Sequence, residues 1–368
     1  MIASIFGSPS SRGASNHWPR LGQKKHRRCL RPEIRGNPRN DEEQQQQMKE
    51  VSICADVWLE VFAYVSPREL GHLMALISDR FDVLVDEHFK LRKWSLDSLQ
   101  ICRAIGGNGA QIIKRSSEQL PIPQGPLPNK VTGFKRIWIR YVDQPVIEFL
   151  QRIRRLFDSS GTTVEIGTSV IQSHSWEIIC QKIWPLINDN ICGFRLLDAH
   201  LDRLRQFSPA VLCNCANLRS LSCYGLIPEF PAEDNAGASP GQALAKWVFT
   251  RRKDGLPNMF CCGHYSARMV ALKRAFVNAS EPVNFIISFW NDWDHRLVPF
   301  ELKNNLTGER LTFRRIGGYW LLVRCPIARE ETKWAEWEEE AIRWTCIWWP
   351  RQWNCIVIAF NDRDIGDG

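Results

Sequence analysis

The stretch RIWIRYVDQPVIEFLQRIRRLF, residues 136–157, indicates the fold class, because a run typical of a strand passes directly into a helical pattern. Residues 136–142 are rich in Ile, Trp, Tyr and Val and predict a β-strand. The residues that follow, 144–157, predict a helix. A strand followed at once by a helix is the building unit of α/β proteins.

The same alternation continues along the chain. Further strands are predicted at 162–168, 192–198, 218–224, 258–264 and 283–289, with helical patterns between them, and successive strands start 26, 30, 26, 40 and 25 residues apart. Most of these intervals are close to the leucine-rich-repeat period of about 20–29 residues, and LRSLSC at 218–223 resembles such a repeat. We therefore predict an irregular leucine-rich-repeat-like β/α solenoid over 131–295. A doubly wound parallel sheet remains the alternative, since alternation alone supports either fold.

The pattern changes near residue 296. Three strands with turns at 304–308 and 317–318 are followed by a helix and by a last strand at 355–360. Residues 296–368 thus predict a small α+β unit, a β-meander plus a helix, that caps the open end of the solenoid. Trp334, Trp337, Ala341 and Trp344 share one helical face, which favours core packing over a ligand surface.

The charge of the chain is concentrated in its N-terminal tail. The net charge is +8, and residues 1–50 alone hold ten basic and five acidic residues in a Ser-, Pro-, Gly- and Gln-rich segment that we expect to be disordered. KKHRR at 24–28 is better explained as a solvated charge run than as a nuclear-import or phosphate-contacting patch. The folded part is not expected to bind nucleic acid, and a nucleic-acid-associated factor acting through the tail is the weaker hypothesis.

Cysteine usage and hydropathy point to an intracellular protein. The 13 cysteines are odd in number and scattered, which is typical of free thiols in a reducing compartment. The sequence contains neither a recognisable signal peptide nor an apolar run of about 18 residues. We expect a soluble protein of the cytoplasm, the nucleus or both.

Catalytic and metal-binding patterns are weak. The sequence has no P-loop, no dinucleotide-binding glycine motif and no G-x-S-x-G elbow. Zinc sites built from Cys213, Cys215 and Cys223, or from Cys261, Cys262 and His264, are disfavoured by their spacing. We predict no catalytic residue, no metal and no cofactor.

Residues 51–95 predict three short amphipathic helices, followed by a linker at 96–130 that contains the Pro-rich segment 121–128. Ser66, Pro67 and Glu69 have the spacing of a helix N-terminus with a capping box, and Ser78 is a candidate cap for the third helix. His72 and His88 are expected on the surface. So small a unit cannot bury its apolar faces alone, so either a partner covers them or the unit caps the solenoid.

This helical segment, ICADVWLEVFAYVSPRELGHLMALISDRFDVLVDEHF at 53–89, resembles the F-box. Its register of apolar positions, Ser66-Pro67 and the Ser78/Arg80/Phe81 end match the family pattern, with Cys54 standing where the family usually has Pro. The rest of the chain is similar to the lineage-expanded F-box families of nematodes, particularly plant-parasitic cyst nematodes, through NNLTGERLTFRR, WLLVRCPI and FNDRDIGDG.

The resemblance implies a non-catalytic substrate-recognition adaptor of an SCF-type cullin–RING ubiquitin ligase. Its partners would be a Skp-type adaptor, a cullin bound through that adaptor, and a protein substrate whose binding residues are unknown. The alternative is a non-enzymatic interaction scaffold. The residues expected to be shared between the Skp-adaptor interface and the internal core of the unit are Ile53, Val57, Trp58, Val61, Phe62, Val65, Pro67, Leu70, Leu73, Ile77 and Phe81.

Overall fold

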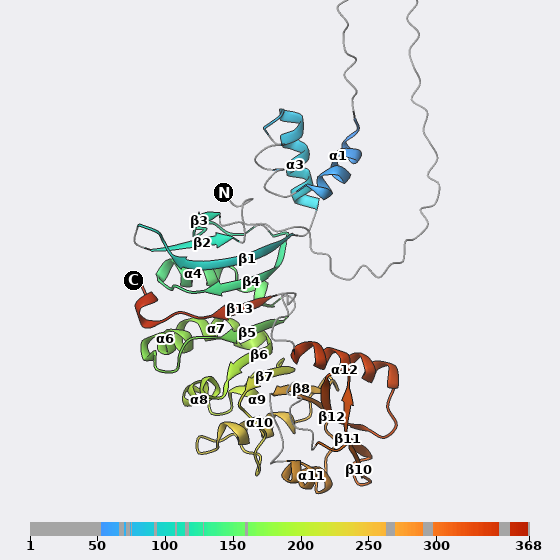
Figure 1. The fold of residues 1–368 in the computed structure, drawn as a ribbon. Helices are drawn as coiled ribbons and strands as arrows, with labels where there is room; N and C mark the ends of the chain where they lie inside the picture. The colour runs from blue at the N-terminus through green and yellow to red at the C-terminus, as the bar shows by residue number, and fades with distance from the viewer. Residues whose placement is uncertain are drawn as a thin grey trace, which may run out of the picture. The chain divides into compact units, whose positions relative to one another are not determined.

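The computed structural model describes residues 53–366, with gaps at 66–69, 71–73, 75, 92–93, 107–108, 115–117, 128, 159–160, 263–268, 290–296 and 346–353 (Figure 1). The predicted disordered tail and the Ser66–Glu69 capping box lie outside the described residues. The chain divides into two compact units, a helical unit that ends at residue 92 and a sheet unit that begins at residue 93.

The helical unit contains the first and third of the three predicted helices. Helix α1 spans Ala55–Val61 and continues into one 3-10 turn at Phe62–Tyr64, and helix α3 spans Asp79–Leu91. Ser78 caps α3 as predicted, because its Oγ accepts a hydrogen bond of 3.4 Å from the backbone N–H of Phe81. Acidic residues in the first turn of α3 and basic residues in its last turn complement the helix dipole.

The sheet unit is a mixed α/β structure built on one 13-stranded sheet with the order β10-β11-β12-β9-β8-β7-β6-β5-β13-β4-β1-β2-β3. Its strands are β1 Trp94–Arg103, β2 Ala110–Lys114, β3 Gln119–Pro121, β4 Val131–Ile139, β5 Thr162–Ile166, β6 Ile191–Leu197, β7 Ser220–Tyr224, β8 Asn258–Cys262, β9 Phe285–Phe289, β10 Phe300–Asn304, β11 Glu309–Ile316, β12 Tyr319–Pro326 and β13 Cys355–Ile358. The six strands predicted between 136 and 289 correspond to β4 through β9.

The connecting helices follow the strands of the parallel part. They are α4 Gln144–Arg152, α5 Arg154–Asp158, α6 Ser173–Ile178, α7 Trp184–Ile187, α8 Asp198–Phe207, α9 Val211–Asn214, α10 Pro240–Val248 and α11 Met269–Val277, with a π-helical turn at Ile179–Ile183 between α6 and α7. Asp143 caps α4 through a 3.0 Å hydrogen bond from the backbone N–H of Val146. Within the described ranges, no helix has both the length and the apolar character needed to cross a bilayer.

The strand order from β5 to β9 advances one position at a time without reversing. These strands are parallel, as are β1, β4 and β13, whereas β2, β3 and β10 to β12 are antiparallel additions at the two edges. A doubly wound sheet requires a reversal of the strand order, and this region has none. Because crossovers between parallel strands are right-handed, a one-way order places their helices on one face.

Helix α12, Glu331–Thr345, covers the other face (Figure 1). Trp334 and Ala341 are buried in a core cluster with Met259, Ile286 and Leu321 from the strands. The Trp stripe is therefore core packing, as predicted. Further along α12, the indole of Trp344 packs directly on Gly193 of β6 and leaves no room there for a Cβ.

The predicted linker at 96–130 is wrong, because it contains β2, β3 and most of β1. Leu96, Leu99 and Ile101 are buried, and β1 pairs in parallel with β4. The Pro-rich segment is held to the sheet unit as well. Arg152 donates a 2.8 Å hydrogen bond to the carbonyl of Pro123, and Ile122 and Leu127 are buried.

The boundary predicted at residue 296 also needs correction. The meander β10–β12 is present, but β12 pairs with β9, so the meander extends the same sheet. The last strand, β13, lies between β4 and β5 in the middle of the sheet. All four of its residues are buried, as is typical of a strand covered on both faces. Residues 296–366 are therefore part of the sheet unit and do not form a separate cap.

Candidate functional site

The apolar residues of the helical unit divide into an interior set and an exposed set. Phe62 and Leu70 are completely buried, and Trp58, Val65 and Phe81 pack against them. The ring centroids of Trp58 and Phe81 are 4.7 Å apart in an edge-to-face contact. These five of the predicted interface residues hold the helices together.

Four other predicted residues, Ile53, Val57, Val61 and Ile77, are exposed. Val57 and Val61 stand one turn apart on α1, and 46% of Val57 is accessible to solvent. Pro67 and Leu73 lie outside the described residues. The sequence alone does not show which of these residues are interior and which are exposed. The contacts and burial of α1 and α3 distinguish the two sets.

Three more large apolar residues of the unit are exposed although the predicted set did not include them. They are Tyr64, Leu76 and Val83, of which Tyr64 is 93% and Leu76 80% accessible. Together with the four above they form the exposed apolar set: Ile53, Val57, Val61, Tyr64, Leu76, Ile77 and Val83. Tyr64 and Leu76 both fall in the register by which residues 53–89 resemble the F-box, and the predicted set did not use them.

The exposed apolar set is dense for the size of the unit. Of 17 large apolar side chains exposed in the described part of the chain, seven belong to it, although the unit supplies only residues 53–91. Exposed apolar side chains concentrated in one small region are typical of protein interaction sites.

His88 is a correction to the sequence analysis, which placed it on the surface. Its side chain is only 2% exposed and packs edge-to-face on Phe62, with 5.7 Å between the ring centroids. Three residues before the end of α3, it faces the interior because it follows the buried Val85 by three positions on the same helical face.

The backbone at the entry into α1 has a conformation that proline favours. Cys54 precedes the helix with φ −68° and ψ 156°, and its side chain makes no capping hydrogen bond. Proline fixes φ near this value, so the backbone here has the conformation that a proline would impose. A side chain of Arg80 also donates a hydrogen bond to the carbonyl of Ile53, which ties the entry segment to α3.

Cys54→Pro is therefore expected to stabilise the helical unit by about 0.4–1 kcal/mol, because it restricts the unfolded chain without changing the folded one. Amide hydrogen exchange of residues 55–65 in the full chain measures the change, with Cys54→Ala as the control that removes the thiol alone. Faster exchange in the proline variant than in the alanine variant would contradict this account of the entry segment.

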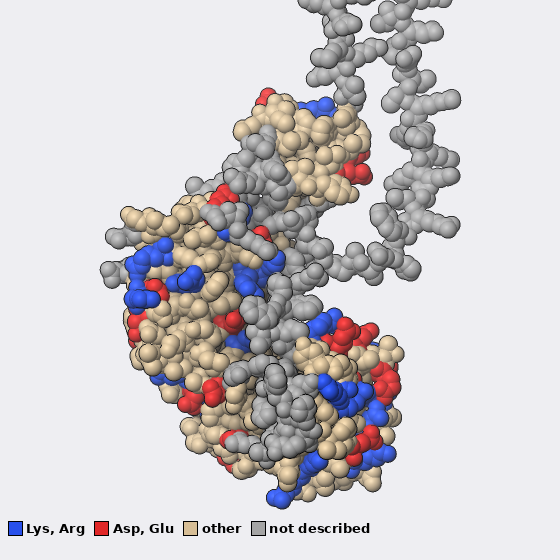
Figure 2. Space-filling view, viewed as in Figure 1, with Lys and Arg blue, Asp and Glu red and all other residues tan. Residues whose placement is uncertain are grey.

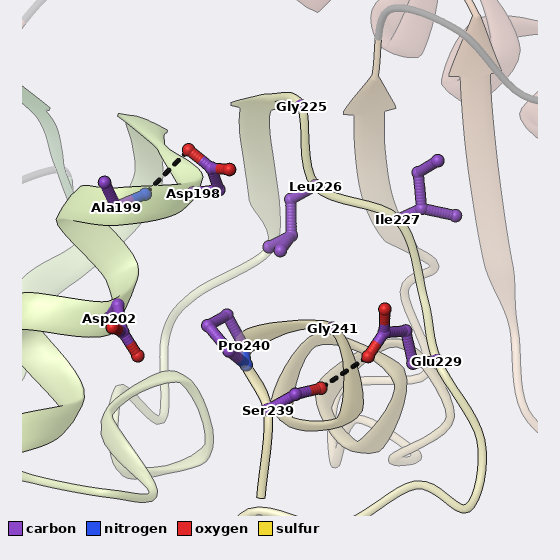
Figure 3. A pocket seen from close by; sticks show the side chains of 10 residues that line it. All are labelled: Asp198, Ala199, Asp202, Gly225, Leu226, Ile227, Glu229, Ser239, Pro240 and Gly241. Atoms are coloured by element: carbon purple, nitrogen blue, oxygen red, sulfur yellow. Dashed lines mark hydrogen bonds between the residues drawn. The ribbon is translucent and has the colours of Figure 1, made fainter.

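A second candidate is a pocket of about 330 Å³ at the carboxyl ends of β6 and β7 (Figure 3). Open α/β sheets bind small ligands at this edge. The lining side chains come from the first turn of α8, the chain after β7 and the start of α10, and the charged ones among them, Asp198, Asp202 and Glu229, are all acidic. This charge disfavours phosphate and other anionic ligands.

Two acidic groups of this pocket, Asp198 and Glu229, already serve the two helix starts. Asp198 accepts a 2.7 Å hydrogen bond from the backbone N–H of Ala199, and Ser239 donates a 2.5 Å hydrogen bond to Glu229 (Figure 3). Ser239 and Gln242 also form a complete capping box at the start of α10. The arrangement accounts for these side chains as structural caps.

The cysteine clusters considered for zinc were also examined in the fold. His264 lies outside the described residues, and the described residues contain no group of three or more His, Cys, Asp or Glu side chains that could hold a metal ion. Burial raises the pKa of the Cys213 thiol to about 11 and that of Cys215 to about 12, so both thiols are protonated at neutral pH.

Comparison with known protein families, with curated proteins and with solved structures finds no match to this chain. Functional inference therefore depends on the residues of the chain itself. Among these features, the exposed apolar set gives the strongest indication of a binding partner.

Proposed function

We propose that this protein is a substrate-recognition adaptor of an SCF-type cullin–RING ubiquitin ligase and that its helical unit binds a Skp-type adaptor. The exposed apolar set carries the proposal: a unit with a very small interior leaves seven large apolar side chains accessible to water. The F-box register of residues 53–89 supports the identity of the partner.

The division of the apolar residues assigns them two roles in this proposal. Phe62, Leu70 and Val85 form the interior that keeps α1 and α3 together, so they act on the interface only through the fold. The exposed apolar set provides the contact surface. Complete burial of one such side chain contributes about 1.5–3 kcal/mol, so several of them can offset the cost of association.

The sheet unit is the proposed substrate-recognition part. Its one-way order from β5 to β9 supports an irregular leucine-rich-repeat-like solenoid, with β13 as an insertion that a regular repeat lacks. In this proposal the protein performs no chemistry. It holds a substrate near the conjugating enzyme that the cullin recruits through the Skp-type adaptor, in the cytoplasm or the nucleus, and thereby raises the effective concentration of substrate lysines.

Reconstitution tests the proposal. The full chain and a purified Skp-type adaptor are expected to form a stable complex on size-exclusion chromatography, and this complex is expected to bind a cullin. The alternative, an interaction scaffold whose helical unit is only a cap, predicts no complex. A folded chain, shown by circular dichroism, that elutes separately from the adaptor would refute the proposed function.

A further inference from the structure

The sheet face that carries α12 continues beyond that helix onto β6, β5, β13, β4 and β1. Paired residues of neighbouring strands share a face, so the register shows which side chains stand here. One row contains Gln100, Trp138, Val357, Glu165 and Arg195, and a second row contains Ser98, Arg136, Cys355, Thr163 and Gly193. Gly193 is the residue covered by Trp344 of α12, which confirms that these rows lie on the α12 face.

Part of this face is a groove of about 310 Å³ over β1, β2 and β4. Its lining includes Gln100, Ile113, Lys135, Arg136 and Trp138. Trp138 is 37% exposed, and the guanidinium of Arg140 lies over its ring at 5.2 Å. Lys and Arg side chains lie over the part of the unit formed by β1 and β4, with Asp and Glu side chains among them (Figure 2).

The positive charges on this face are poorly neutralised. Among the described residues no carboxylate lies within ion-pair distance of Lys135, Arg136 or Arg195, although Glu165 is the cross-strand neighbour of Arg195. One terminal nitrogen of Arg195 is buried without a hydrogen-bond partner.

The thiol of Cys355 shows that these charges lie close together. It interacts electrostatically with Arg136, Glu165 and Arg195, and Arg136 hydrogen-bonds to it. Burial nevertheless raises the pKa of Cys355 to about 11, so the thiol stays neutral and provides no negative charge for Arg136. Glu165 is the one acidic side chain in the two rows.

We propose that this face binds an acidic, extended segment of a protein partner. Carboxylates of the segment would pair with Lys135 and Arg136, which line the groove, and an apolar side chain of the segment would pack on Trp138. If the protein is the proposed ligase adaptor, this segment is the recognition signal of its substrate, so the inference specifies the substrate class and in that sense depends on the proposed function.

Fluorescence anisotropy of the full chain with a labelled oligoglutamate peptide tests the proposal, with oligoglutamine as the uncharged probe. Oligoglutamate is expected to bind more tightly than oligoglutamine and to weaken with added salt. Lys135→Glu and Arg136→Glu should each weaken binding about tenfold, which corresponds to about 1.4 kcal/mol. Lys303→Glu, a charge reversal at the exposed edge strand β10, is the matched control and should bind like the wild type.

Glu165→Gln separates this proposal from a folding defect, because it should tighten oligoglutamate binding by removing the repelling charge, whereas a damaged fold can only weaken it. Equal effects of Lys135→Glu and Lys303→Glu, no gain from Glu165→Gln, or no binding by the wild type would overturn the proposal. If a single-stranded oligonucleotide binds more tightly than oligoglutamate and the same variants weaken its binding, the face recognises nucleic acid and not an acidic protein segment. Skp-adaptor binding, measured on the same variants, should stay at the wild-type level. If the wild-type chain binds oligoglutamate but does not bind the Skp-type adaptor, the ligase function is rejected and the proposed peptide site is retained.

Discussion

Val57→Asp is expected to weaken binding of the Skp-type adaptor by about 30-fold or more, since burying an unpaired carboxylate in an apolar interface removes at least about 2 kcal/mol. The substitution should leave the helical unit folded. Val57 is 46% exposed and stands in the first turn of α1, where a negative charge interacts favourably with the helix dipole.

Isothermal titration calorimetry of the full chain with the adaptor measures the effect. Two further variants serve as controls, one for a surface charge and one for loss of the fold. Leu306→Asp places the same carboxylate at an exposed apolar position of the sheet unit and should bind like the wild type. Phe62→Ala should lose binding together with helical circular dichroism, because Phe62 is completely buried in the interior of the unit. Wild-type affinity of Val57→Asp would show that α1 does not contact the adaptor.

Arg324→Met is expected to lower the free energy of unfolding of the sheet unit by about 3–5 kcal/mol, because it leaves the Glu309 carboxylate buried without its partner. Both side chains are about 1% exposed, and Arg324 donates hydrogen bonds of 3.1 and 2.6 Å to one oxygen of Glu309. It also donates to the carbonyl of Glu281 at 2.8 Å. The ion pair therefore joins β11 and β12 to the chain that leads into β9.

Urea unfolding of Arg324→Met, Glu309→Met and the double variant measures the coupling. The double variant should be less destabilised than either single variant, since no buried charge is left unpaired. Arg314→Met is the control. It removes a more exposed arginine that pairs with Glu338 and should cost about 1 kcal/mol or less. Additive losses in the double variant would show that the two side chains contribute independently.

The sequence predicted the elements whose signal is local. The six strands that became β4 to β9, the helices at 55–61 and 79–91, and the Ser78 cap all follow from periodicity or from residues within one turn. The place of β13 could not be predicted in this way. Its apolar run indicates burial on both faces, but nothing within Cys355–Ile358 specifies β4 and β5 as its neighbours.

The missed strand β1 and the division of the helical unit escaped the sequence analysis for a similar physical reason. β1 was missed because its residues on the open face are polar, with Ser98 and Gln100 alternating with Leu99 and Ile101, and because the Pro-rich segment after it is typical of a linker. The division of the helical unit was out of reach for a similar reason. Val57 and Trp58 are adjacent and both apolar, and only the packing of Phe81 decides that Trp58 turns inward.

The insertion of β13 has a consequence for how the molecule is made. Residue 355 pairs with residues 136 and 163, so these contacts close very long loops. Until the ribosome has released the segment around 355–358, β4 and β5 have no shared partner, and each presents an unpaired edge of a kind that promotes aggregation. The sheet unit should therefore complete its fold only after the segment 355–358 has left the ribosome.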